Sequence, residues 1–242
     1  MLEAGSDTTS STMVGFIQAM ACFPHVQSKA QAEIDRVVDS KRLPTMEDAD
    51  NLPYIRAMIK ETLRWMPTTP TGGIPHAVTV DDEYNGFFIP KGAQLMNNVW
   101  ALNMDDTRYP NPREFRPERY EGDQSTAAES AANPDPAKRD HFTFGAGRRI
   151  CQGMHIAERS LFLGMSRILW GFNISPKIRD GKCVPIDTGK LTQGFVCLPD
   201  KFECDIRPRD SARATVIREE WQASKREVLD PDTFQLMYDI SN

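Results

Sequence analysis

The segment Phe144-Gly-Ala-Gly-Arg-Arg-Ile-Cys151-Gln-Gly153 places a cysteine in a short run of glycines and arginines. A chance match to its five characteristic residue types in a chain of 242 residues is on the order of one in ten thousand. Glycines let the backbone approach the sulfur, so that amide N–H groups can stabilise a thiolate. The alternative is a buried cysteine beside a glycine-rich turn. The characteristic positions are Phe144, Gly147, Arg149, Cys151 and Gly153.

A helical pattern follows this cysteine directly. Apolar residues at 156, 161, 163, 165, 168 and 169 predict a largely buried helix over residues 152–172. The positive end of the helix dipole would then lie next to Cys151 and would favour its thiolate form. The segment therefore predicts a thiolate ligand held at the start of a core helix.

The composition excludes several classes of protein. A net charge of −5 provides no basic field for nucleic acid. The five cysteines are odd in number and lack the Cys-x-x-Cys spacing of zinc sites, so neither a disulfide framework nor a zinc module is expected. No apolar run approaches the ~20 residues of a membrane span, and the first residues do not resemble a signal peptide. We therefore expect no anchor in this chain.

The rest of the sequence predicts a mixed fold, mainly α-helical with small antiparallel β-sheets. Tyr84-Asn85-Gly86 is a strong hairpin signal within residues 74–98. Five prolines in residues 105–140 predict a long irregular loop. We expect the polar tail to dock a surface helix through Trp221, Val228 and Leu229. Other helices are predicted over residues 13–22, 25–40 and 53–65, and short strands over 184–186, 195–198 and 202–206.

The cysteine segment resembles the ligand loop of the cytochrome P-450 superfamily, the heme-thiolate monooxygenases. The resemblance implies that Cys151 binds the iron of heme b (iron protoporphyrin IX), where a thiolate favours O–O cleavage. It also implies that Arg149 pairs with a heme propionate and that Phe144 shields the sulfur. Gly147 and Gly153 complete the loop. His76 is expected to reach the second propionate, although a lone histidine is more often a packed or surface residue.

Two further motifs occur in the family's order. Glu61-Thr-Leu-Arg64 and Arg119 resemble its Glu-Arg-Arg structural network, whereas the alternative is a solvated helical ion pair worth only ~0.2–0.5 kcal/mol. Ala4-Gly-Ser-Asp7-Thr8 is similar to its oxygen-binding helix motif, in which Asp7 and Thr8 relay protons. The alternative is a helix N-terminus with ordinary capping residues.

The resemblance implies the C-terminal part of the cytochrome P-450 fold. Residues 1–207 form its heme-binding portion and residues 208–242 a polar tail. We expect a fungal microsomal-type monooxygenase that hydroxylates a small apolar organic substrate, with Pro70–Ile74 and Thr192–Phe195 lining the pocket. The alternative is a truncated, catalytically inactive heme-binding or interaction fragment.

The resemblance also implies a redox partner, because the chain contains no Gly-rich dinucleotide fingerprint of its own. Electrons are expected from NADPH through a separate reductase that contacts Lys138, Arg139 and Arg148. For the full-length family we expect the cytosolic face of the endoplasmic reticulum membrane, reached through an N-terminal anchor that this chain lacks.

Overall fold

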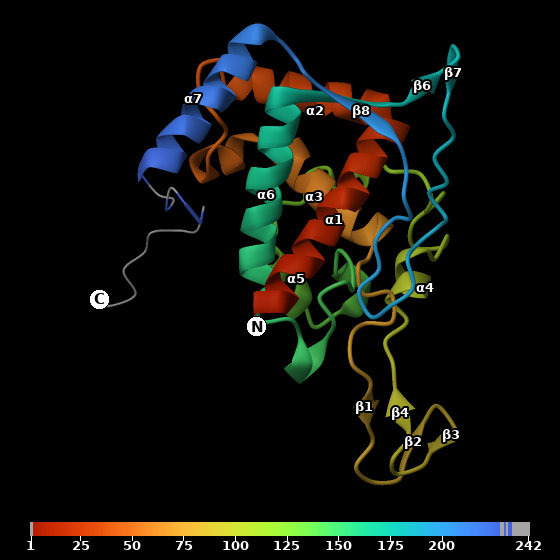
Figure 1. The fold of residues 1–242 in the computed structure, drawn as a ribbon. Coiled ribbons are helices and arrows are strands. Elements are labelled where there is room, and N and C mark those ends of the chain that lie inside the picture. The colour runs from red at the N-terminus through yellow and green to blue at the C-terminus, as the bar shows by residue number, and fades with distance from the viewer. Residues whose placement is uncertain (1, 228–229, 231, 234–242) are drawn as a thin grey trace.

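Four helices form the centre of the molecule (Figure 1). The structure is a computed structural model that describes residues 2–227, 230 and 232–233. The strand pairs within residues 76–95 project from one end of the helical body, and the last helix lies along one side. The central helices are α1 (Leu2–Cys22), α2 (Pro24–Val37), α3 (Pro53–Trp65) and α6 (Met154–Gly171).

The core lies where these helices pack together. α1 and α6 cross closely, because Gly164 of α6 leaves room for the Met13 side chain. The predicted helices over 53–65 and 152–172 are confirmed, the second beginning two residues later and ending one earlier. The predicted start of the first helix was wrong, since α1 includes residues 2–12 as well. Fully buried core side chains include Phe16, Met20, Ile34, Met165 and Leu169.

Two small hairpin-like pairs follow α3 and confirm the predicted antiparallel strands. Asn85 and Gly86 both have positive φ, 49° and 80°, as the Asn-Gly turn requires. The outer pair aligns His76 with Leu95. The pairs are β1 (His76–Ala77) with β4 (Gln94–Leu95), and β2 (Asp82–Tyr84) with β3 (Phe87–Ile89).

The segment over residues 105–140 is mainly irregular, as predicted, but contains short helices. The helix α4 (Val99–Asn103) precedes this segment, and the first short helix begins at Pro117. The Thr126 hydroxyl accepts from Glu129 N, and the Glu129 carboxylate accepts from Thr126 N, which forms a capping box. The sequence signal for that helix was therefore present. The short helices are η2 (Pro117–Tyr120), α5 (Ala127–Ala132) and η3 (Pro136–Lys138).

The strands after α6 differ from the prediction. Residues 184–186 and 195–198 form no strand, and the predicted strand at 202–206 lies at β8 (Cys204–Pro208). β8 pairs with β5 (Phe172–Pro176), which the sequence analysis missed because it follows α6 without a turn residue. A second pair joins β6 (Ile178–Arg179) to β7 (Lys182–Cys183).

The tail helix is α7 (Ser211–Glu227), and it packs on α6. Ile217 provides the contact, because its Cδ1 lies 2.8 Å from the position that a Cβ on Gly171 would occupy. The predicted docking through Trp221 was wrong, since that side chain is 51% exposed. Val228 and Leu229 lie outside the described residues.

Candidate functional site

The loop before α6 folds back on itself and presents Cys151 at the surface. Cys151 N donates to Phe144 O at 2.9 Å, which closes the loop. Gly145 and Gly147 have φ of 77° and 67°, which L side chains adopt only at a cost. The short helix η4 (Gly147–Arg149) follows. The thiol of Cys151 is exposed and forms no disulfide.

Gly153 differs from the other two loop glycines. It is the residue before α6 and has φ of −84°, which any residue can adopt. A Cβ at this position would lie 3.8 Å from Cys151 Sγ, an ordinary contact. The predicted close approach to the sulfur is therefore present at Gly153, but the backbone conformation requires glycine only at Gly145 and Gly147.

The other predicted heme contacts lie in different surroundings. Arg149 and His76 are both exposed, and within the described part of the chain neither side chain has a hydrogen-bond or ion-pair partner. Phe144 is half-buried against the core, with its ring 5.5 Å from that of His141. The loop thus offers the Cys151 sulfur as a possible metal ligand and the exposed guanidinium of Arg149. Ile74, Ile156 and Phe195 expose apolar side chains. This donor set fits an apolar macrocycle with an iron centre and carboxylate substituents.

Glu61, Arg64 and Arg119 meet in the interior. Glu61 and Arg64 are both 0% exposed and pair through two contacts of 2.7 Å, Arg64 Nε to Glu61 Oε2 and Arg64 Nη2 to Glu61 Oε1. Arg119 Nε reaches Glu61 Oε1 at 3.3 Å, and Arg116 N donates to the same oxygen at 2.8 Å. The arrangement ties α3 to the segment around η2, and it is not a solvated surface pair.

Burial and pairing oppose each other at Arg64. Removal from water lowers the pKa of the guanidinium, but the hydrogen bonds and charge of Glu61 outweigh it, so the pKa is raised. Arg64 stays charged because Glu61 accepts from it in a bidentate manner. A buried pair of this kind fixes geometry more than it adds stability.

The Gly5–Thr8 motif lies inside α1, so Ser6, Asp7 and Thr8 do not cap the helix. The Thr8 hydroxyl donates to Ala4 O at 2.8 Å. Asp7 is exposed to solvent. The structure brings Glu61, Arg64 and Arg119 together and places Phe144, Gly147, Arg149 and Gly153 around Cys151. Asp7 and Thr8 lie on α1 and His76 lies on β1, and among the described residues no hydrogen bond or ion pair joins their side chains to that loop.

Comparison with known proteins identifies this arrangement. A sequence model of the cytochrome P450 family matches residues 1–205. The chain belongs to the cytochrome P450 family. The match includes the loop of residues 144–153 (the ligand loop, or Cys151 loop), the contacts among Glu61, Arg64 and Arg119 (the Glu61 network) and the Gly5–Thr8 motif. It ends before α7.

Relatives and solved structures agree with this assignment. The chain is 54% identical to a cytochrome P450 monooxygenase of Humicola fuscoatra and 51% identical to one of Hypocrea virens, in each case over 92% of this chain. It spans 41% and 40% of those two proteins. A zebra fish cytochrome P450 structure with progesterone is 30% identical, with a TM-score of 0.69, and is matched over 86% of this chain and 43% of that one.

The P450 chain also contains buried polar residues that the sequence analysis missed. Asn103 and Thr143 lie between the Glu61 network and the ligand loop, and Asp140, His141 and Lys60 lie beside them. Burial lowers the pKa of His141, although the neighbouring Asp140 opposes this. An asparagine inside the apolar run Val-Trp-Ala-Leu-Asn103 was the only available signal, because the partners are distant in sequence.

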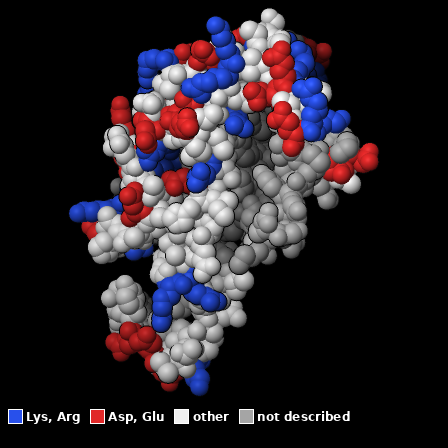
Figure 2. All heavy atoms as spheres, turned by 90° about the vertical axis from the view of Figure 1, so that its left-hand side faces the viewer, with Lys and Arg blue, Asp and Glu red and all other residues white. Residues whose placement is uncertain are grey.

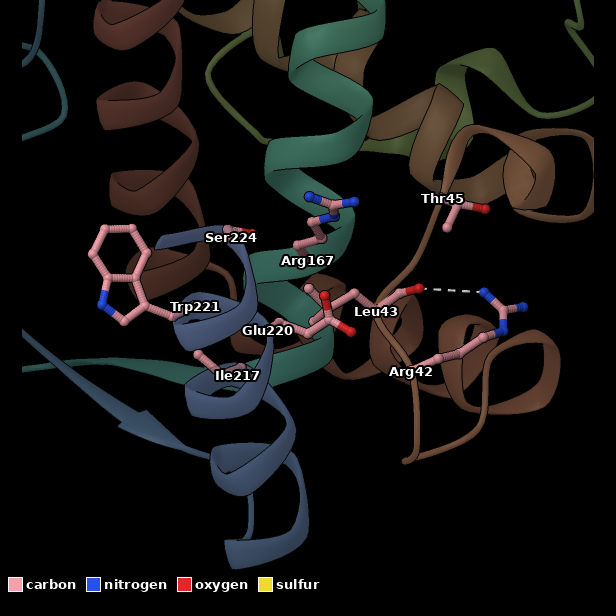
Figure 3. Close-up of a pocket in the computed structure, with 8 residues that line it drawn as sticks. All are labelled: Arg42, Leu43, Thr45, Arg167, Ile217, Glu220, Trp221 and Ser224. Atoms are coloured by element: carbon pink, nitrogen blue, oxygen red, sulfur yellow. Dashed lines mark hydrogen bonds between the residues drawn. The ribbon is translucent and has the colours of Figure 1, made fainter. Parts of the chain in front are cut away.

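A hollow on another face is built from different residues (Figure 3). It lies between α7, α6 and the segment around Leu43, and Trp221 stands at its edge. Its two arginines already have partners, since Arg42 pairs with Asp48 at 2.7 Å and Arg167 Nε donates to Pro44 O at 3.0 Å. None of the residues that line the hollow belongs to the Cys151 loop.

Charged side chains of both signs lie on the surface of the chain (Figure 2). On the face in Figure 2, side chains of both signs are interspersed over the upper part, uncharged residues predominate in the described part of the middle, and smaller charged groups of both signs lie near the lower end. Among the described residues no helix is long and apolar enough to cross a bilayer.

Proposed function

We propose that this chain forms the heme-thiolate part of a monooxygenase, with Cys151 as the iron ligand. The observation that carries the proposal is the free, exposed Cys151 thiol at the tip of a closed glycine loop. Membership of a family whose named relatives are monooxygenases supports it. The division into a heme-binding portion over 1–207 and a tail over 208–242 is part of this proposal.

Each residue of the ligand loop has a distinct task. Cys151 Sγ donates to the iron, and Phe144 limits the access of water to the sulfur. Arg149 and His76 bind the two propionates and orient the macrocycle. When bound, heme b supplies the redox-active iron that activates dioxygen for insertion into an organic substrate.

Asp7 and Thr8 would supply protons. Asp7 is exposed and can exchange protons with bulk water. The Thr8 hydroxyl donates to Ala4 O, and after a rotation of its side chain it could donate a proton to dioxygen, with Asp7 as the neighbouring acid that exchanges with water. The two residues thus form a short proton path along α1.

The substrate class follows from the exposed apolar side chains. Ile74 and Phe195, within segments 70–74 and 192–195, are 74% and 55% exposed. These segments favour a small apolar organic substrate over a charged one. Electrons would come from NADPH through a separate reductase that contacts Lys138, Arg139 and Arg148. In the whole protein we place the activity at the cytosolic face of the endoplasmic reticulum membrane.

One observation favours a second candidate, a fragment that binds heme or a partner without catalysis. The chain spans 40% and 41% of the Hypocrea virens and Humicola fuscoatra relatives, and large apolar side chains such as Ile74 and Ile156 are exposed. Exposed apolar surface costs ~25 cal/mol per Å² in water, which predicts poor solubility or poor heme retention.

A spectrum of the reduced, carbon monoxide-treated protein separates the two. The chain is measured alone and as a chimera joined to the N-terminal part of the Humicola fuscoatra relative. We expect the Soret band of thiolate ligation in the chimera, its loss in Cys151→Ala, and no change in the control Cys183→Ala, another exposed free cysteine. Substrate oxidation by the chimera but not by the chain, each supplied with NADPH and a reductase, supports the whole-protein function. Absence of the band from both proteins contradicts the heme-thiolate proposal.

A further inference from the structure

Asn103 occupies the interior between the Glu61 network and the ligand loop. It is the last residue of α4, is 0% exposed and accepts from Arg64 Nη1 through its backbone oxygen at 2.9 Å. Its position relative to α3 is therefore set by the same guanidinium that pairs with Glu61.

The Asn103 side chain holds the segment that leads into the loop. Nδ2 donates to Thr143 Oγ1 at 3.3 Å, and Oδ1 accepts from Phe142 N at 3.5 Å. Thr143 Oγ1 in turn donates to Leu63 O at 2.8 Å. Because the one hydroxyl proton of Thr143 is used for Leu63 O, the hydroxyl can only accept from Asn103. Both ends of the amide therefore have a defined orientation.

This chain of bonds ends at the ligand loop. Phe142 and Thr143 immediately precede Phe144, whose oxygen accepts from Cys151 N at 2.9 Å. We propose that Asn103 is a positioning residue that transmits the placement of α3 to Cys151, with the Thr143 hydroxyl as its partner. The role of Cys151 in this inference rests on the heme-thiolate function proposed above.

If Asn103 only stabilised the fold, its loss should affect the whole chain and not the ligand loop in particular. Gln27 is a residue of that kind and serves as the comparison. Gln27 is also a buried side-chain amide with two backbone contacts, because Nε2 donates to Ile174 O at 2.8 Å and Oε1 accepts from Ile174 N at 2.7 Å. It joins α2 to β5. Loss of either amide should destabilise the fold, but only loss of Asn103 should act selectively on the ligand loop.

The test compares Asn103→Leu and Thr143→Val with Thr143→Ser, which keeps the hydroxyl, and with the control Gln27→Leu. Amide hydrogen exchange over residues 142–151 in the 242-residue chain is the readout that needs no cofactor, measured relative to exchange in α1. We expect about tenfold faster exchange in Asn103→Leu and Thr143→Val. Thr143→Ser and Gln27→Leu should keep the parent rates in this segment.

The carbon monoxide spectrum of the heme-loaded chimera is the second readout. The thiolate-type band should give way to the band of a displaced or protonated sulfur in Asn103→Leu and Thr143→Val only. Equal loop exchange in all variants overturns the inference, and so does an unchanged band in those two variants. If the parent chimera has no thiolate-type band, the proposed function fails, while loop exchange still decides whether Asn103 positions the segment.

Discussion

The Glu61 network is buried in the interior, whereas the Cys151 loop is exposed to solvent. Glu61 and Arg64 are fully buried, and their charged groups find partners on α3, near α4 and around η2. In the loop, the Cys151 thiol and the Arg149 guanidinium are exposed and have no acidic partner among the described residues.

The difference separates a scaffold from a binding surface. A buried charge without a partner would be costly, so the network has to be satisfied by this chain itself. Exposed groups are solvated and can remain unpaired until a ligand arrives. The predictions below test this contrast, from the largest expected effect to the smallest.

Removal of the shared carboxylate should have the largest effect. Glu61→Ala leaves the buried Arg64 and the half-buried Arg119 without their carboxylate partner, and we expect a loss of about 3–5 kcal/mol in unfolding free energy. Urea unfolding measures it. Glu203→Ala breaks an exposed pair with Arg179 at 2.9 Å and should cost no more than ~1 kcal/mol. Equal losses would show that burial does not distinguish the two pairs.

The ligand loop should respond to backbone conformation. Gly147→Ala forces a side chain into a left-handed conformation and should cost about 1–2 kcal/mol in unfolding free energy. Gly153→Ala, at φ −84°, should stay within about 0.5 kcal/mol. Neither Cβ would clash, so the comparison isolates the backbone term. A Gly153→Ala variant as unstable as Gly147→Ala would contradict this assignment.

Acid should weaken the region between scaffold and loop. Burial lowers the pKa of His141 in the folded state, so the unfolded chain takes up a proton first as the pH falls. Stability contributed by the neutral ring is therefore present above about pH 6.5 and is lost progressively below it. His141→Gln should flatten the pH dependence of unfolding below pH 6.5, and His25→Gln, at an exposed histidine, is the matched control. A slope that both variants share with the parent would exclude His141 as the cause.

The smallest effect on stability is expected at Arg149. Because its side chain is exposed and unpartnered within the described structure, Arg149→Ala should change the unfolding free energy by less than about 0.5 kcal/mol. Heme affinity in the chimera should nevertheless fall about tenfold, which a heme-transfer titration measures. Arg148→Ala is the matched control, and an equal loss there would contradict a specific propionate contact.

Local signals predicted the elements that local chemistry defines. Pro53 and Pro67 bracket α3, and Asn85-Gly86 forces the hairpin, because these residues restrict the backbone wherever they occur. The predicted helix began at residue 13 because residues 5–10 are poor helix formers, but α1 begins at Leu2. Its next turn, with Ser11 and Thr12, is buried against the fold. Packing, rather than helix propensity, therefore accounts for the helical turn at Ser11 and Thr12.

The sequence by itself predicted the family, the candidate ligand cysteine and the order of its motifs, because the spacing around Cys151 and the Glu61–Arg64 pair are short-range patterns. The family resemblance also predicted that Arg119 joins Glu61. Only the tertiary structure decided that β5 pairs with β8 and that Asn103 lies beneath the loop. Each of these contacts joins residues about 30 or more positions apart. Such contacts are selected by burial and hydrogen-bond satisfaction over the whole chain, and no local pattern encodes them.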